Sequence, residues 1–219
     1  TFMPIFILLI FIFYVFAENW LINFIYLSIT GYYYQVINMS IADLVKGLLA
    51  KSTPRHVTRR HWSPEDYRRF VEHIDDAVLQ EYQSTELGLI LQLPNLSSRT
   101  VVDLGCGYGR IFPHIAPHAK GIVGIEINKH MLRAAKKEAA KYANVEVVKA
   151  DITRELPIKR ILQFGHNPVL VCLQNTLGTL EGSARDALSQ MDRVAHISKA
   201  DVVLSIFFQE ALPSYGVQL

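Results

Sequence analysis

Cysteine and charge are both scarce in this chain of 219 residues. The two cysteines, Cys106 and Cys172, lie far apart in sequence, which excludes a disulfide scaffold and is typical of a reduced cytosolic domain. Hydrophobic residues make up 50% and charged residues 19% of the chain, so intrinsic disorder and collagen-like repeats are excluded as well. The eight histidines show no paired spacing of metal ligands, and we therefore predict no metal site. A formal net charge of +2 by itself favours no class of partner.

Charge is almost absent from residues 1–42, where Glu18 is the one charged side chain. Residues 2–17 and 20–37 form two uncharged runs, and about 20 apolar residues in a helix span a bilayer core of about 30 Å. These runs predict an apolar helical segment with one or two transmembrane helices, and membrane association through residues 2–37. The connector at 43–62 is basic, so by the positive-inside tendency the rest of the chain is expected in the cytoplasm.

Two other interpretations of this segment stay open. Residues 15–17 resemble the cleavage site of a signal peptide, although neither lysine nor arginine precedes the apolar run. Met39 and Ser40 also resemble the start of a soluble protein, in which case residues 1–38 are a non-native extension.

From residue 63 onward the pattern is that of an α/β domain. Ser63, Pro64 and Asp66 predict the start of a helix, with the serine as its N-cap. Short apolar strands are expected at 100–104, 121–127, 145–150, 169–173 and 202–208, with helices near 109–118, 128–142 and 183–196. This alternation predicts a doubly wound (Rossmann-like), mainly parallel sheet. We divide the chain into an apolar segment (1–42), a basic linker (43–62) and this domain (63–219).

A glycine-rich turn follows the first of these strands and reads Asp103-Leu104-Gly105-Cys106-Gly107-Tyr108-Gly109. Glycines at alternate positions let the backbone turn sharply and approach a ligand closely, and the helix that follows presents free N–H groups. Glu126 ends the second strand and Asp151 follows the third, so both are expected at the same edge of the sheet. A carboxylate there can accept hydrogen bonds from the hydroxyls of a ribose. Because a nicotinamide dinucleotide is bound by the different spacing G-x-G-x-x-G, another nucleoside cofactor is favoured.

Residues 103–109, 122–128, 149–152 and 170–178 resemble the successive motifs of class I S-adenosylmethionine-dependent methyltransferases. The resemblance covers about residues 63–210 and implies S-adenosylmethionine as the cofactor. It also implies that Gly105, Cys106, Gly107 and Gly109 wrap the methionine part of this cofactor. Asp103 would support the amino group of the methionine through the loop or a water.

The resemblance assigns the remaining cofactor residues to the ends of the next three strands. Glu126 would bind both ribose hydroxyls, and Ile127 would pack on the adenine. Asp151 would accept a hydrogen bond from the adenine amino group, with Ile152 beside the ring. Gln174 and Asn175 would lie near the methionine end and the transferred methyl group.

These motifs leave the methyl acceptor and any general base unidentified. Segment 173–178 lacks the Asn/Asp-Pro-Pro-aromatic signature used on exocyclic amines and glutamine side chains, and it lacks the Pro-Cys pair of cytosine-carbon methylation. We therefore expect a small-molecule acceptor and no nucleic acid. The alternatives are a binding module that holds the cofactor without turnover and, less favoured, a nicotinamide-dependent oxidoreductase.

The C-terminal end of the sequence departs from the family pattern. The family's sheet closes with an antiparallel hairpin after the fifth strand, whereas this chain ends at Leu219, soon after residue 208. The strand at 202–208 is therefore expected to be an uncovered apolar edge, which is prone to aggregation. We expect either a C-terminal truncation or cover supplied by another chain.

Overall fold

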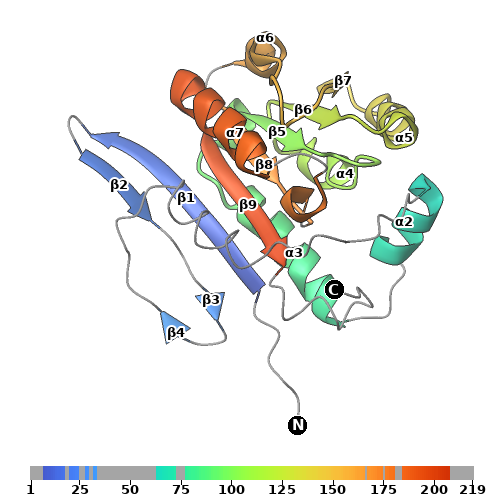
Figure 1. Cartoon of the computed structure of the whole chain (residues 1–219), viewed down its shortest axis with the longest axis horizontal. Coiled ribbons are helices and arrows are strands. Elements are labelled where there is room, and N and C mark those ends of the chain that lie inside the picture. Colours follow the sequence, from blue (N-terminus) through green and yellow to red (C-terminus); the bar gives the residue numbers. More distant parts are fainter. Residues whose placement is uncertain are drawn as a thin grey trace.

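The computed structural model of the chain describes residues 63–72, 77–165, 167–174, 176–180 and 184–207, together with the backbone of four strands between residues 7 and 33. The predicted basic linker at 43–62 lies outside these residues, so the proposed domain boundaries stay predictions. In the part from residue 63 onward, strands and helices alternate along the chain (Figure 1).

The predicted parallel sheet is confirmed. Its five strands lie in the order β7-β6-β5-β8-β9, and each pairs in parallel with its neighbour. The strands are β5 (Thr100–Leu104), β6 (Gly121–Glu126), β7 (Val145–Lys149), β8 (Val169–Cys172) and β9 (Asp201–Phe207). The chain therefore reverses its direction of winding between β5 and β8, and in open α/β sheets a ligand crevice forms at such a point.

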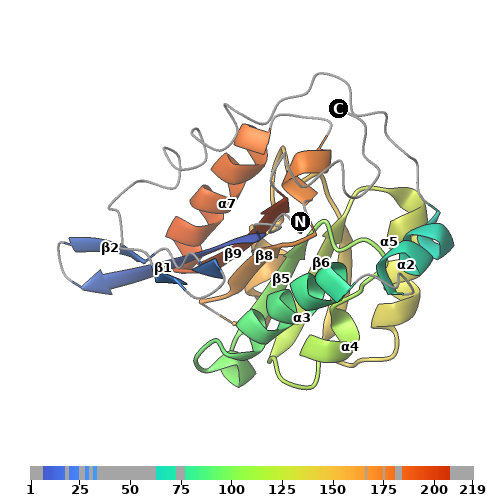
Figure 2. The same ribbon diagram turned by 90° about the horizontal axis from the view of Figure 1, so that it is seen from below.

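Helices cover both faces of this sheet (Figure 1, Figure 2). One face carries α6 (Ile158–Ile161) and α7 (Ala184–Ser198), and the other carries α3 (Ala77–Leu91), α4 (Phe112–Ile115) and α5 (Lys129–Ala139). Successive residues of a strand point to opposite faces. In β5, Val102 and Leu104 accordingly pack in the α7 layer, whereas Val101 packs against the α3 and α4 layer. This burial on both faces explains why the strands are continuous apolar runs.

Side-chain caps start two of the helices where the sequence predicts them. The hydroxyl of Ser63 accepts the N–H of Asp66 at 3.0 Å and so begins α2 (Pro64–Glu72). Asn128 Oδ1 accepts the N–H groups of His130 at 2.9 Å and of Met131 at 3.2 Å, which begins α5. Both caps satisfy backbone donors that have no partner within their own helix.

The N-terminal segment differs from the helical segment expected at 1–42. The structure has strands β1 (Ile7–Ala17), β2 (Trp20–Phe24), β3 (Ser28–Ile29) and β4 (Tyr32–Tyr33) in this part of the chain. The segment is rich in β-branched and aromatic residues, which favour strands. Within the helices that the structure describes, none is long and apolar enough to cross a bilayer. Membrane association of residues 2–37 stays a prediction.

The same strands change the expectation of an uncovered sheet edge at 202–208. β1 pairs antiparallel with β9, from Ile7 opposite Phe207 to Ile12 opposite Val202, and β2 pairs antiparallel with β1. The N–H and C=O groups along that edge of β9 therefore find partners within the same chain. This pairing removes the exposed edge that would otherwise invite association with another strand.

The packing around Gly124 of β6 generates a stability prediction. A Cβ atom at this position would lie 2.7 Å from Cζ of Phe112 and 2.9 Å from Sγ of Cys106, both of which are buried. We expect Gly124→Ala to lower the free energy of unfolding by about 1–3 kcal/mol, because a rigid ring must shift to admit the methyl group. Urea denaturation measures this change.

Gly88 of α3 is the matched control. A Cβ atom there meets only the end of the Gln92 side chain, at 3.9 Å. Since alanine is favoured over glycine inside a helix, Gly88→Ala should raise the free energy of unfolding by up to about 1 kcal/mol. Equal effects of the two substitutions would contradict the packing described here.

Candidate active site

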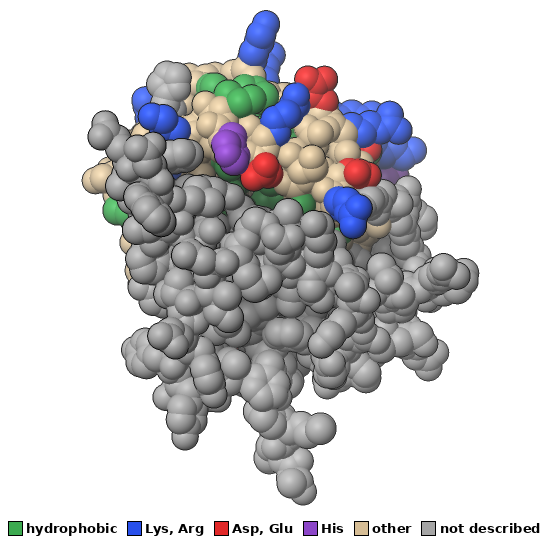
Figure 3. All heavy atoms as spheres, turned by 60° about the vertical axis from the view of Figure 1, so that its left-hand side comes forward, with side chains coloured by type: hydrophobic (Ala, Val, Ile, Leu, Met, Phe, Trp, Pro, Cys, Tyr) green, Lys and Arg blue, Asp and Glu red, His purple; other side chains and the backbone are tan. Residues whose placement is uncertain are grey.

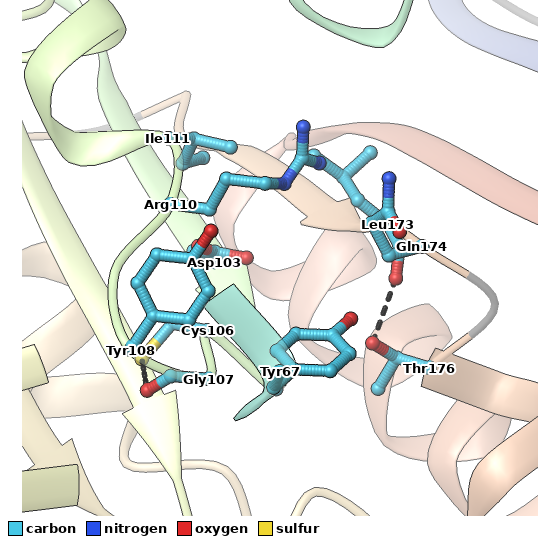
Figure 4. A pocket seen from close by; sticks show the side chains of 11 residues that line it. Tyr67, Asp103, Cys106, Gly107, Tyr108, Arg110, Ile111, Leu173, Gln174 and Thr176 are labelled. Atoms are coloured by element: carbon cyan, nitrogen blue, oxygen red, sulfur yellow. Dashed lines mark hydrogen bonds between the residues drawn. The ribbon is translucent and has the colours of Figure 1, made fainter. Parts of the chain in front are cut away.

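A pocket opens at the carboxyl ends of β5 and β8, beside the glycine-rich turn (Figure 4). It is therefore located at the expected reversal of the strand order. The pocket is lined by Tyr67, Asp103, Gly105, Cys106, Gly107, Tyr108, Arg110, Ile111, Leu173, Gln174 and Thr176.

The glycine-rich turn is held against β6 by backbone hydrogen bonds. The N–H groups of Gly105 and Cys106 both donate to the carbonyl of Ile125, at 2.8 and 3.0 Å. Gly105 has φ of +79°, and a Cβ atom on it would lie 2.5 Å from Cγ2 of Thr176. A Cβ atom on Gly107 would meet a ring carbon of Tyr67 at 4.0 Å, an ordinary van der Waals distance. The turn is thus packed tightly against Thr176 at Gly105 and less tightly at Gly107.

Glu126 connects the end of β6 to this turn. Its carboxylate accepts the N–H groups of Gly107 at 2.9 Å, Ile127 at 2.8 Å and Asn128 at 2.7 Å, and the residue is 8% exposed. Burial raises the pKa of Glu126, and the three N–H groups oppose this rise because they stabilise the carboxylate. The end of β6 is therefore joined to the glycine-rich turn, although Glu126 itself is not among the residues that line the pocket.

Asp103 is a buried carboxyl group on the floor of the pocket, 5% exposed. Burial raises its pKa to about 7 and the charges of Glu86 and Glu126 add to the rise, whereas the Arg110 guanidinium opposes it. No residue in the described part of the chain donates a hydrogen bond to this carboxyl group. Asp103 is thus suited to a cationic group that enters the pocket.

Gln174 brings a donor to the pocket from the end of β8. It has φ of +52°, a left-handed conformation that costs a residue other than glycine free energy and is frequent at functional sites. Its side-chain Nε2 atom is buried and has no hydrogen-bond partner among the described residues. An unpaired buried donor is unfavourable by about 1–3 kcal/mol, so a ligand that accepts from it gains binding free energy.

Two tyrosines close another side of the pocket and hold α2 against the glycine-rich turn. The rings of Tyr67 and Tyr108 meet edge to face, with centroids 6.0 Å apart. The Tyr108 hydroxyl donates to Oε1 of Glu72 at 2.9 Å, and the Arg68 guanidinium lies 4.7 Å from the centre of the Tyr108 ring. Burial raises the pKa of Tyr67 to about 12, so this hydroxyl stays protonated at neutral pH.

Five of the predicted cofactor residues line the pocket, namely Asp103, Gly105, Cys106, Gly107 and Gln174. Gly109 has φ of +88° and packs against Phe112 just beyond the pocket wall. Burial raises the pKa of the Cys106 thiol, which keeps it in the unreactive protonated form.

The other predicted residues lie outside the pocket lining. Ile127 is 55% exposed beside Glu126, and Ile152 is 6% exposed within the core next to α7. Asp151 accepts the N–H of Thr153 at 2.9 Å and its hydroxyl at 2.7 Å. Asn175 lies outside the described residues. The individual roles of all these residues stay predictions.

Sequence reasoning did not assign Tyr67, Tyr108, Arg110 or Glu86 to the site. Tyr67 falls in the apolar stripe of a helix, and Tyr108 and Arg110 occupy positions between and after the glycines where any residue is compatible with the turn. For Glu86 the sequence holds one indication of a special role, because a carboxylate stands directly before the apolar residues 87–90.

Residues 101–196 match a family model described as "Methyltransferase domain". The match covers less than half of the chain and includes most of the predicted motifs, so it agrees with the resemblance to S-adenosylmethionine-dependent methyltransferases and with the cofactor that this resemblance implies. The resemblance that the sequence motifs suggested is thereby confirmed.

Among curated proteins, the chain is similar to the "Ribosomal RNA small subunit methyltransferase A" of Koribacter versatilis (strain Ellin345), with 25% identity over 134 residues. The aligned part covers 61% of this chain and 44% of the relative, so the chain spans less than half of that protein's length.

Similar solved structures include two further methyltransferases. The magnesium protoporphyrin IX methyltransferase from Synechocystis PCC 6803, with bound SAH, has 20% identity and a TM-score of 0.45, over 63% of this chain and 64% of that chain. An S-adenosylmethionine-dependent methyltransferase from Aquifex aeolicus has 19% identity and a TM-score of 0.42, over 61% and 67% of the respective chains.

The raised pKa of Asp103 generates a second prediction. The folded protein keeps a proton on Asp103 up to about pH 7, whereas the unfolded chain releases it near the ordinary value of 3.8. The contribution of Asp103 to the free energy of unfolding therefore falls as the pH rises between these two values. An asparagine side chain cannot ionise, so Asp103→Asn should be more stable than the wild type at pH 8. The gain should be on the order of 1.4 kcal/mol for each unit by which the pKa is raised.

Urea denaturation between pH 5 and pH 8 measures this effect, and the difference between variant and wild type should shrink toward pH 5. Asp186→Asn, at an exposed position of α7, is the control for the loss of a carboxylate elsewhere in the chain. If the difference in unfolding free energy between Asp103→Asn and the wild type does not change with pH, the raised pKa of Asp103 is contradicted.

Proposed function

We propose that this protein transfers a methyl group from S-adenosylmethionine to a small-molecule acceptor. The observation that carries this proposal is the set of ligand-binding groups around one pocket. A glycine-rich turn, a buried carboxyl group without a donor and a buried amide without an acceptor all meet there.

These groups fit the amino-acid end of the cofactor. Asp103 offers an acceptor for the ammonium group, and the Nε2 donor of Gln174 and the Arg110 guanidinium suit the carboxylate. The absence of a side chain at Gly107 lets the ligand approach the backbone. Glu126, held by three N–H groups at the same edge, is positioned for the ribose hydroxyls.

When bound, the cofactor supplies an electrophilic methyl group on a sulfonium centre. The residues of this chain then contribute by positioning, which in well-oriented systems lowers a barrier by about 7–11 kcal/mol. Gln174 and the glycine turn hold the methionine end, and the rings of Tyr67 and Tyr108 exclude water from one side of the pocket. Tyr67 remains protonated at neutral pH and so serves as a hydrogen-bond group, not as a base.

The acceptor proposal rests on the end of β8 and on the surface charge. Residues 173–178 lack the signatures of exocyclic-amine and cytosine-carbon methylation. Among the described residues on the face shown in Figure 3, acidic side chains lie between the basic ones.

RNA is the second candidate acceptor, and two observations favour it. The relative from Koribacter versatilis is named for ribosomal RNA. On α5, four exposed cations pair with no carboxylate in the described part of the chain, and these are Lys129, Arg133, Lys136 and Lys137. Such a row of cations suits contacts to phosphates.

Transfer of a radiolabelled methyl group into a cell extract separates these proposals. Label in a fraction of low molecular mass that resists ribonuclease is expected for a small-molecule acceptor. Label that ribonuclease releases from a high-mass fraction would instead establish RNA. Binding of the cofactor with no labelled product would support the binding module, and binding of NADH without competition from S-adenosylhomocysteine would support the oxidoreductase.

The role of Glu126 is tested by the affinity for S-adenosylhomocysteine. We expect Glu126→Ala to weaken this affinity at least tenfold, because the variant loses the ribose acceptor and also the contact that holds Gly107. Isothermal titration calorimetry measures the dissociation constant. Glu138→Ala removes a partly buried carboxylate of α5 that pairs with Lys141, and it should leave the affinity unchanged. Equal affinities of Glu126→Ala and the wild type would refute the ribose assignment.

A further inference from the structure

Glu86 is a charged residue in the core that none of the methyltransferase motifs contains. It lies in α3, its side chain is 0% exposed, and it stands directly before the apolar residues 87–91 of the helix. Glutamate is almost never completely buried unless it is paired. The contacts of the Glu86 carboxylate therefore show which partners stabilise its charge in the core.

The carboxylate of Glu86 joins four elements of the fold. Its Oε2 atom accepts from Nη2 of Arg110, which follows the glycine-rich turn, at 2.5 Å. Its Oε1 atom accepts the backbone N–H of Gln174, at the end of β8, at 2.8 Å. The same oxygen also accepts the hydroxyl of Ser205 in β9, which is in turn in contact with the Tyr82 hydroxyl of α3.

Two of these partners, Arg110 and Gln174, line the pocket. They follow β5 and β8, the two strands at whose carboxyl ends the pocket opens. Arg110 and Gln174 reach the same end of the pocket in Figure 4, and Glu86 is bonded to both of them. The contact to Gln174 is made at the residue with φ of +52°. A charge-assisted hydrogen bond to its N–H stabilises this unfavourable conformation and so fixes the direction of the unpaired Nε2 donor.

We propose that Glu86 is a positioning residue, which sets Arg110 and Gln174 on the walls of the pocket so that both can bind the amino-acid end of the cofactor. This role rests on the proposed function of the pocket. Glu86 itself acts through Arg110 and Gln174 and lies behind them. Loss of its charge releases the guanidinium, and the backbone at Gln174 loses the anion that holds it.

The test is the dissociation constant of S-adenosylhomocysteine for Glu86→Gln, measured by calorimetry well below the melting temperature. The variant keeps the shape of the side chain but presents an amide to Arg110. We expect affinity to fall at least tenfold. Asp201→Asn is the matched control, because Asp201 also pairs with an arginine, Arg99, at 2.6 Å, at the opposite ends of the strands. It should lower the melting temperature and change the affinity less than twofold.

A double variant shows whether Glu86 acts through Gln174. Gln174→Ala alone should weaken binding two- to fivefold. Adding it to Glu86→Gln should produce little further loss, since without the Glu86 carboxylate the Gln174 side chain is no longer held in the direction that binds the ligand. Losses that multiply would overturn the proposed action through Gln174. If Glu86→Gln does not fold, Glu86→Asp keeps the charge on a shorter side chain and should weaken binding three- to tenfold.

The failure of this role and that of the proposed function are distinguishable. Affinities within twofold of the wild type for Glu86→Gln or for Glu86→Asp would overturn the positioning role while the wild type still binds. A wild-type protein that does not bind S-adenosylhomocysteine would overturn the proposed function itself.

Discussion

The hydrogen bond from the N–H of Gly107 to the carboxylate of Glu126 holds together the two halves of the site. A glycine-rich turn alone does not specify which ligand is bound, and a carboxylate at the end of a strand is common in α/β folds. The contact of 2.9 Å joins the end of β6 to the turn that follows β5, and the proposed binding of a nucleoside and an amino acid as one molecule depends on this connection. The backbone of Ile125 secures the same arrangement through the N–H groups of Gly105 and Cys106.

Burial of charge is the second constraint on this site. Arg110 is the cation that faces Glu86 and Asp103, and it forms its short ion pair with Glu86. Asp103 therefore gains too little from Arg110 to offset its own burial, and its pKa rises to about 7. Carboxyl groups whose ionised form is destabilised by burial are common at functional sites, where ligand binding rather than stability has been favoured.

The fold can be predicted from the sequence to a large extent, because each strand and helix leaves a local pattern. Val101 and Val102 are buried on opposite faces, so the strand is apolar throughout, and Asn128 caps its helix through its own neighbours. Within the apolar run 2–17, for which a helix is expected, the structure has the strand β1 at Ile7–Ala17, because an apolar run does not distinguish a helix from a strand that pairs with β9. Tyr67 has the sequence pattern of a core residue, because helical spacing of apolar residues does not distinguish a side chain in the core from one that lines a pocket.

The methyltransferase motifs, the cofactor and the parallel order of strands follow from residues that are close together in the chain. The spacing of glycines and acidic residues requires no knowledge of distant contacts, and the family match over residues 101–196 agrees with it. Glu86 and Gln174 are 88 residues apart, and only folding shows that a helix carboxylate holds the backbone at the end of β8. Contacts of this kind join elements far apart in sequence, and no periodicity or motif records them, because they depend on how the layers pack.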